Sequence, residues 1–226
     1  MTTRATTWAW ALELWTTHFA PLAEGGLVLE RVDEETYWPL HEAELRAHFP
    51  PEVFFEFDVL GGDARRARHA RLDASLGGTP LREYVVVRDG VGGPLVAMFA
   101  GSLARASTYR MEHSNVHPTY RRRGIYQRIL ACTIAYTAAL GVDMIESDHA
   151  PSNSPILRAK LAAGFRITTM DVDASVGPSL VLRYFHDPQQ LAAYEFRCGL
   201  ATLTPAMVAG ATGAIAQLRA QLAPSG

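Results

Sequence analysis

The most constraining feature of this chain is a basic turn that joins a strand pattern to a helix pattern. Residues 108–116 have the composition of a strand, residues 124–140 carry apolar side chains at helical spacing, and Arg-Arg-Arg-Gly at 121–124 lies between them. The first N–H groups of a helix have no intrahelical partner, and the helix dipole adds partial positive charge there. A glycine lets the backbone approach a ligand closely. The turn is therefore typical of a phosphate site, although three adjacent arginines also suit a solvated surface.

Strand and helix patterns continue on both sides of the turn. A strand, a helix and a second strand with short connections predict a parallel strand pair inside a mixed α/β sheet flanked by helices. Residues 84–88 and 95–103 are expected to form a hairpin. The other strands are expected at 27–31, 142–147, 165–173 and 180–185, and the other helices at 36–48, 63–76 and 153–163.

Composition limits the class of protein. The chain has 226 residues, 48% of them hydrophobic and 19% charged, with a formal net charge of -2. These values argue against intrinsic disorder and against a nucleic-acid partner. Two cysteines are too few for a disulfide framework or a cysteine zinc site, which fits a reducing cytoplasm. Glu13 interrupts the N-terminal apolar run before it reaches the length of a membrane span, so no membrane partner is expected.

The order of elements and two short motifs resemble the GNAT superfamily of acyl-CoA-dependent N-acetyltransferases. That family has the loop pattern [QR]-x-x-G-x-[GA] between a strand and a helix, and Arg121 and Gly124 match it, whereas Tyr126 replaces the small residue. An asparagine, Asn153, is followed one helix later by Gly-Phe at 164–165, as in the family. The resemblance implies a GNAT-like α/β fold with a mixed, mostly antiparallel sheet and a central parallel strand pair, flanked by helices.

The resemblance also implies acetyl-CoA, or another acyl-CoA, as co-substrate and no metal. Backbone amides of the turn would hold its pyrophosphate, in a cradle that Tyr126 would narrow, and the pantetheine arm would enter between the strands at 108–116 and 142–147. Asn153 would lie beside that arm, although it suits the N-cap of the following helix equally well. The expected cofactor-binding residues are Val116, Arg121, Arg122, Arg123, Gly124, Ile125, Tyr126 and Asn153.

Acyl transfer to an amine needs a base, a donor that polarises the thioester and an acid for the leaving thiolate. The strand at 108–116 is unusually polar for a central strand, which indicates that it borders a cleft, unless the face is simply solvated. GNAT enzymes often place a carboxylate there, so Glu112 is the first candidate base. His113 is the second, and strand alternation predicts that it lies on the opposite face. The backbone N–H of Val116 would polarise the carbonyl.

The predicted acid is Lys160, the only lysine among 21 basic residues. It stands seven residues after Asn153, where GNAT enzymes commonly keep a tyrosine. Burial beside the cofactor would lower its pKa and suit proton donation to a thiolate, whereas an exposed helix position is the alternative. Three polar residues at the end of the next strand are expected to bind the positive charge of the acceptor or to supply another base, unless they are solvated loop residues. They are Glu146, Asp148 and His149.

These observations predict an N-acyltransferase that moves an acetyl or related acyl group directly from acyl-CoA to a small-molecule or peptide amine, because no nucleophile motif such as G-x-S-x-G is present. The alternative is a non-catalytic acyl-CoA-binding or regulatory module of the same fold. Residues 1–26 are expected to form an amphipathic helix packed on a GNAT-like acyltransferase domain at 27–187, followed by a helical extension at 188–226 that leaves a homodimer open. The apolar stripe of the first helix is Trp8, Leu12, Trp15 and Phe19.

Overall fold

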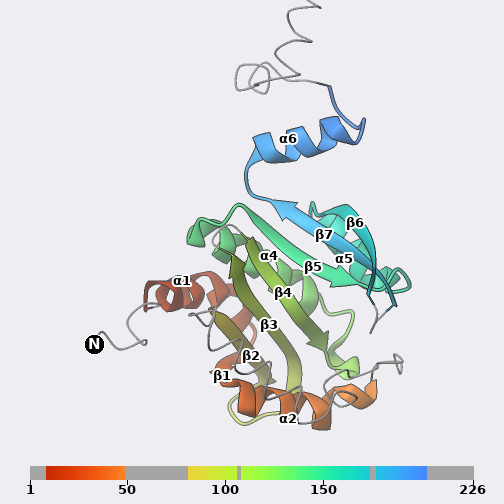
Figure 1. Cartoon of the computed structure of the whole chain (residues 1–226). Coiled ribbons are helices and arrows are strands. Elements are labelled where there is room, and N and C mark those ends of the chain that lie inside the picture. The colour runs from red at the N-terminus through yellow and green to blue at the C-terminus, as the bar shows by residue number, and fades with distance from the viewer. Residues whose placement is uncertain (1–8, 49–80, 106–107, 174–176, 203–226) are drawn as a thin grey trace, which may run out of the picture. The chain divides into compact units, whose positions relative to one another are not determined.

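The computed structural model describes residues 9–48, 81–105, 108–173 and 177–202 (Figure 1). The chain divides into two compact units, Met1–Tyr184 and Phe185–Gly226. In the second unit, helix α6 (Pro188–Arg197) is preceded by Phe185, whose ring stacks on Tyr194 with centroids 5.5 Å apart. The helix predicted at 63–76 and most of the predicted C-terminal extension lie outside the described residues.

A seven-stranded sheet in the order β1-β2-β3-β4-β5-β7-β6 forms the first unit. The pairs β1–β2, β2–β3, β3–β4 and β6–β7 are antiparallel, and β4–β5 is parallel. This confirms the predicted mixed sheet, mostly antiparallel with one parallel pair. The strands are β1 (Leu27–Val32), β2 (Arg82–Asp89), β3 (Leu95–Arg105), β4 (Thr108–Val116), β5 (Met144–His149), β6 (Arg166–Asp173) and β7 (Gly177–Phe185).

Helices cover both faces of the sheet because consecutive strand residues point to opposite sides. Val85 and Val87 of β2 pack in a core cluster with α1 and α4, whereas Tyr84 and Val86 pack in a second cluster with α2. We call these sides the α4 face and the α2 face. Among the described residues of this unit, the helices are α1 (Ala9–Phe19), η2 (Ala20–Ala23), α2 (Glu34–Glu44), η3 (Arg46–His48), η4 (Pro118–Tyr120), α4 (Ile125–Leu140) and α5 (Ser154–Ala162).

Helix α1 buries Trp15 and Phe19 in the α4-face core, where Phe19 stacks on Phe99 at 5.3 Å. Leu12 is 46% exposed, so its place in the predicted stripe is wrong. Ala11 is buried instead, because i, i+4 spacing places it one turn before Trp15. Trp8 lies outside the described residues.

A buried carboxylate fixes β4 against β2 and α4. Glu83 of β2 accepts hydrogen bonds from Tyr109 Oη of β4 at 2.9 Å and Tyr136 Oη of α4 at 2.8 Å, and Arg31 lies 3.6 Å away. The Tyr109 ring packs on Gly101, where an added Cβ would lie 2.3 Å from the hydroxyl. Burial raises the pKa of Glu83, and the two tyrosine hydrogen bonds oppose that shift.

Tyr136→Phe tests this network. We expect the free energy of unfolding to fall by about 1–3 kcal/mol in urea denaturation, because Glu83 loses one of its two hydroxyl donors. Tyr126→Phe on the same helix is the matched control, since the Tyr126 hydroxyl is buried without a hydrogen-bond partner in the described part of the chain. Equal losses in the two variants would show that the Glu83 bond contributes nothing.

Candidate active site

The parallel pairing of β4 and β5 ends early. Only Thr108–Met144, Tyr109–Ile145 and Arg110–Glu146 pair, although β4 continues to Val116 and β5 to His149. The two strands therefore separate after Arg110 and Glu146. Beyond that point β4 keeps its pairing with β3 but offers the backbone groups of its other edge to a ligand.

A β-bulge on β4 changes the alternation of its side chains. Ala100 of β3 pairs with His113 and Gly101 pairs with Met111, which leaves Glu112 as the extra residue. Glu112 and His113 therefore both lie on the α2 face. The prediction that they lie on opposite faces is wrong, because it assumed a regular strand.

The Glu112 carboxylate is exposed and accepts a hydrogen bond from Ser102 Oγ at 2.5 Å. Among the described residues it forms no ion pair, in contrast to Glu34, which lies 3.7 Å from Arg82 on the same face. Glu112 is thus an exposed carboxylate held by a neutral donor.

His113 is fully hydrogen-bonded. Its Nδ1 lies 2.7 Å from Tyr37 Oη, and Asn115 Nδ2 lies 2.5 Å from its Nε2 and 3.0 Å from His41 Nε2. An amide nitrogen only donates, so both Nε2 atoms accept from Asn115, and His113 Nδ1 donates to Tyr37. Burial, with a smaller contribution from His41, lowers the pKa of His113 to about 3. This imidazole holds α2 against β4 and has no free lone pair for a substrate proton.

Lys160 is buried at the point of strand separation, with 1% of its surface exposed. Its Nζ donates to Ser147 Oγ of β5, lies 3.6 Å from Met111 Sδ of β4 and lies 4.8 Å from the centre of the Phe165 ring. Met111 and Ser147 directly follow the last paired residues of their strands. Burial lowers the pKa of Lys160 to about 7, and Asp148 opposes that shift. The alternative of an exposed helix position is therefore wrong.

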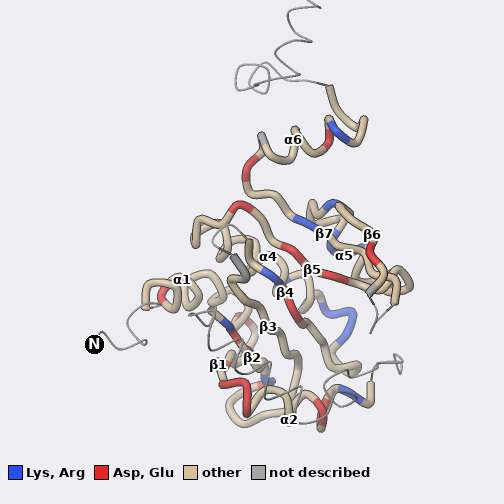
Figure 2. Tube along the Cα trace, viewed as in Figure 1, with Lys and Arg blue, Asp and Glu red and all other residues tan. Residues whose placement is uncertain are grey.

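Two arginines lie beside the strand separation on its α2 face. Arg110 is hydrogen-bonded to Asp148 and lies 3.7 Å from Glu146, and Arg183 lies 2.6 Å from Glu146. Figure 2 shows the resulting mixture of basic and acidic residues along β4, β5 and β7. Both acids predicted to bind a cationic acceptor are thus in ion pairs. His149, whose Nε2 lies 3.3 Å from Ser147 Oγ, has a pKa lowered to about 3 by burial and by Lys160.

The basic turn has a backbone suited to an anion. Gly124 is the N-cap of α4 with φ 76°, and Arg122 before it has φ 62°. The first hydrogen bond of α4 runs from Arg128 N–H to the Gly124 carbonyl at 3.0 Å, so the preceding amides face out of the helix end. Arg121 Nε donates to the carbonyl of Val116 at 3.0 Å and ties the turn to the end of β4.

Three other predicted cofactor residues differ in exposure. The Arg123 side chain is exposed and lies over the Tyr120 ring at 5.0 Å. Ile125 is buried, so only its backbone is available to a ligand. Asn153 is exposed at the N-cap position of α5, but its side chain makes no capping hydrogen bond.

Solved structures with a similar architecture are acetyltransferases. The ribosomal-protein-S5-alanine acetyltransferase of Vibrio fischeri is 14% identical, covers 72% of this chain and 94% of that chain, and has a TM-score of 0.51. The protein yncA of Salmonella typhimurium, assigned as an acetyltransferase and solved with its cofactor acetyl-CoA, is 14% identical over 73% of this chain and 96% of that chain, with a TM-score of 0.50. The chain has the GNAT fold.

Other comparisons add less. Nourseothricin acetyltransferase is 17% identical, with a TM-score of 0.42, over 47% of this chain and 66% of that chain. No family model matches the sequence, and no curated protein does.

Within the GNAT fold, the predicted residues gather around the strand separation. Glu112 borders it on the α2 face and Lys160 on the α4 face, while Glu146 and Asp148 are joined to arginines beside it. Sequence reasoning missed the partners that hold them. These partners are Ser102, Arg110, Met111, Ser147 and Arg183.

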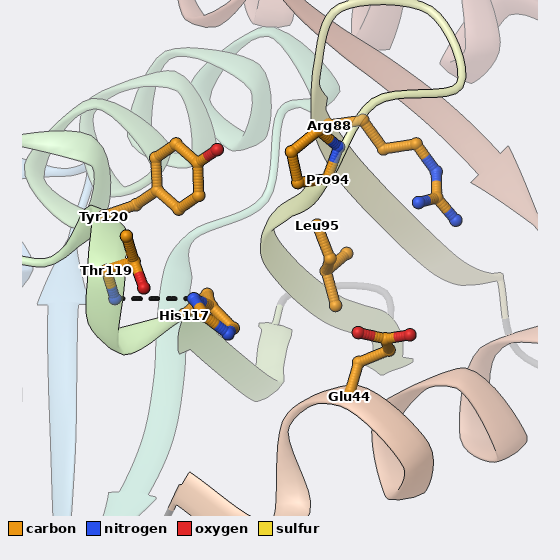
Figure 3. A pocket seen from close by; sticks show the side chains of 7 residues that line it. All are labelled: Glu44, Arg88, Pro94, Leu95, His117, Thr119 and Tyr120. Carbon is orange, nitrogen blue, oxygen red and sulfur yellow. Dashed lines mark hydrogen bonds between the residues drawn. The ribbon is translucent and has the colours of Figure 1, made fainter.

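A cavity of about 380 Å³ lies beside η4 (Figure 3). In it His117 Nδ1 accepts a hydrogen bond from Thr119 N–H at 3.4 Å. None of the predicted catalytic residues lines this cavity. The lining residues are Glu44, Arg88, Pro94, Leu95, His117, Thr119 and Tyr120.

The described residues contain no cluster of three or more His, Cys, Asp or Glu side chains arranged to hold a metal ion. Among the helices of these residues, none has the length and hydropathy needed to cross a bilayer.

His113 should remain neutral throughout the pH range 5–8 because its folded-state pKa is about 3. Nitrogen chemical shifts of histidine-labelled protein will check this, with His113→Gln to assign the signal. The unfolded chain in urea is the control, since free histidine titrates near pH 6.5. A His113 midpoint near neutral pH would restore it as a candidate base.

Proposed function

We propose that this protein is an N-acyltransferase that moves an acetyl or related acyl group from acyl-CoA directly to a small-molecule or peptide amine. The observation that carries the proposal is the placement of two groups where β4 and β5 separate. Glu112, a carboxylate without an ion pair among the described residues, lies on one face, and a buried ammonium, Lys160, lies on the other. The cytoplasmic location, the lack of nucleic-acid and membrane partners, and a homodimer stay predictions.

The residues of the turn fit the phosphates of acyl-CoA. The amides that precede Arg128 N–H are free of intrahelical bonds, and the space beside Gly124 is open, with no atom within 4 Å of an added Cβ. The exposed side chains of Arg122 and Arg123 add charge-assisted donors. Tyr126, which stands where the family has a small residue, packs its ring against the α4-face core, and its hydroxyl is buried.

The strand separation suits the remainder of that molecule, which supplies the reactive thioester when bound. The β4 edge near Val116 offers backbone N–H and C=O groups to the pantetheine arm, as the family resemblance implies. The N–H of Val116 is the proposed donor to the thioester carbonyl oxygen.

We assign each remaining proton transfer to one of the two groups near the strand separation. Glu112 accepts a proton from the acceptor amine, which makes the nitrogen nucleophilic. Lys160 then donates a proton to the sulfur as the carbon–sulfur bond breaks. An ordinary thiol has a pKa of about 8.5, so an ammonium with a pKa of about 7 gives its proton to a thiolate favourably.

Binding and turnover of acetyl-CoA test the proposal. We expect acetyl-CoA to raise the Tm and Glu112→Gln to lower kcat by roughly 100-fold or more while calorimetry shows unchanged acetyl-CoA affinity. Glu35→Gln, an exposed carboxylate of α2, is the matched control and should keep full turnover. Release of free CoA across a panel of amines gives the rate. Binding without CoA release from any amine would favour the non-catalytic module.

The pH dependence of kcat tests Lys160. Proton donation requires the ammonium form, which is present below the folded-state pKa of about 7 and is lost above it, so kcat should decline as the pH rises through that value. Lys160→Arg keeps its charge at all these pH values and should abolish the alkaline decline. Lys160→Met should lower kcat at every pH. An unchanged pH profile in both variants would remove Lys160 from the mechanism.

A further inference from the structure

The Lys160 ammonium is surrounded by neutral groups. Its neighbours are the Ser147 hydroxyl, the Met111 thioether and the Phe165 ring, and no described residue forms an ion pair with it. The His149 imidazole shares the Ser147 hydroxyl, and burial together with Lys160 lowers the pKa of His149 to about 3, so this neighbour is also neutral. Asp148, which acts on it electrostatically, is bonded to Arg110. A buried charge without an ion-pair partner is costly, so this environment favours the neutral amine.

We propose that Lys160 Nζ is itself an acyl acceptor, so that bound acyl-CoA acylates the protein at this residue. The inference rests on the proposed binding of acyl-CoA between β4 and β5. The neutral amine attacks the thioester carbonyl, a carbon–nitrogen bond forms, and the carbon–sulfur bond breaks with its electron pair on sulfur. The proton lost by nitrogen goes to that sulfur, and the products are an Nε-acyl-lysine and CoA thiol.

The position of Lys160 makes the reaction self-limiting. An Nε-acyl-lysine carries no charge and removes the cost of burying an ammonium, and the Ser147 hydroxyl that now contacts Nζ is a ready partner for the new amide. The N–H of the acylated side chain is far too weak an acid to donate its proton to a thiolate. Acylation of Lys160 therefore competes with turnover and stops it.

Self-acylation and turnover depend on opposite forms of the same group. Turnover uses the ammonium, whereas self-acylation uses the amine and should increase as the pH rises. With a pKa of about 7, the self-acylation rate should be about tenfold higher at pH 8 than at pH 6 and then level off. An ordinary lysine, with a pKa of about 10.4, would gain about 100-fold over the same interval and continue to rise.

The test is intact-mass spectrometry of the full chain incubated with saturating acetyl-CoA in an amine-free buffer. We expect up to one acetyl group per chain, mapped to Lys160 by peptide sequencing and resistant to hydroxylamine, which cleaves esters. The sequence has no other lysine, so an N-terminal amine is the only competing primary amine. Lys160→Met, which keeps an unbranched apolar side chain of similar length, should show no acetylation at this peptide.

Each contrary result has a distinct meaning. A rise in Tm with acetyl-CoA but no acetyl on Lys160 overturns self-acylation and leaves the proposed function standing. Hydroxylamine-labile acetyl on Ser147 alone also overturns it. A rate that increases beyond pH 9 overturns it as well, because that profile belongs to a solvated lysine. If acetyl-CoA neither raises the Tm nor binds in calorimetry, both proposals fail.

Discussion

The early end of the β4–β5 pairing determines how the candidate site is built. Three parallel pairs join the strands, and different side chains connect the two strands on the two faces where this pairing ends. On the α4 face Lys160 contacts both strands, and on the α2 face Arg110 reaches both acids of β5. A basic side chain therefore bridges the strands on each side of the sheet. The parallel pair is held by side chains where its backbone bonds stop.

The bridging arrangement depends on a firmly placed β4. Tyr109, the middle residue of the three pairs, is held by Glu83 and by the close approach to Gly101, while Tyr136 brings α4 to the same carboxylate. The bulge at Glu112 comes only three residues after Tyr109. The proposed base is therefore the one residue of this part of β4 that has no partner on β3. The half of β4 that these contacts hold lies before the bulge, and the half proposed to face acyl-CoA lies after it.

The fold was accessible from sequence because its signals are local. The strand at 108–116 has the bounds of β4, the helix stop at Gly141 is visible as a glycine after an apolar stripe, and the motif order gave the parallel pair. The site was only partly accessible. A bulge leaves no mark in residue alternation, so the relative faces of Glu112 and His113 were mispredicted. The engagement of Glu146 by Arg110 and Arg183 depends on strand register, which one sequence does not encode locally.

Because Lys160 is buried, its chemical labelling can report how often the structure around it opens. All other cationic side chains are arginine or histidine, so amine-directed reagents find one side-chain target, enclosed between two strands. Such a reagent reacts only during the moments when the enclosure opens, as amide hydrogens exchange only from open states. The labelling rate of Lys160 Nζ would therefore measure how often this enclosure opens. A ligand bound between the strands would lower that rate.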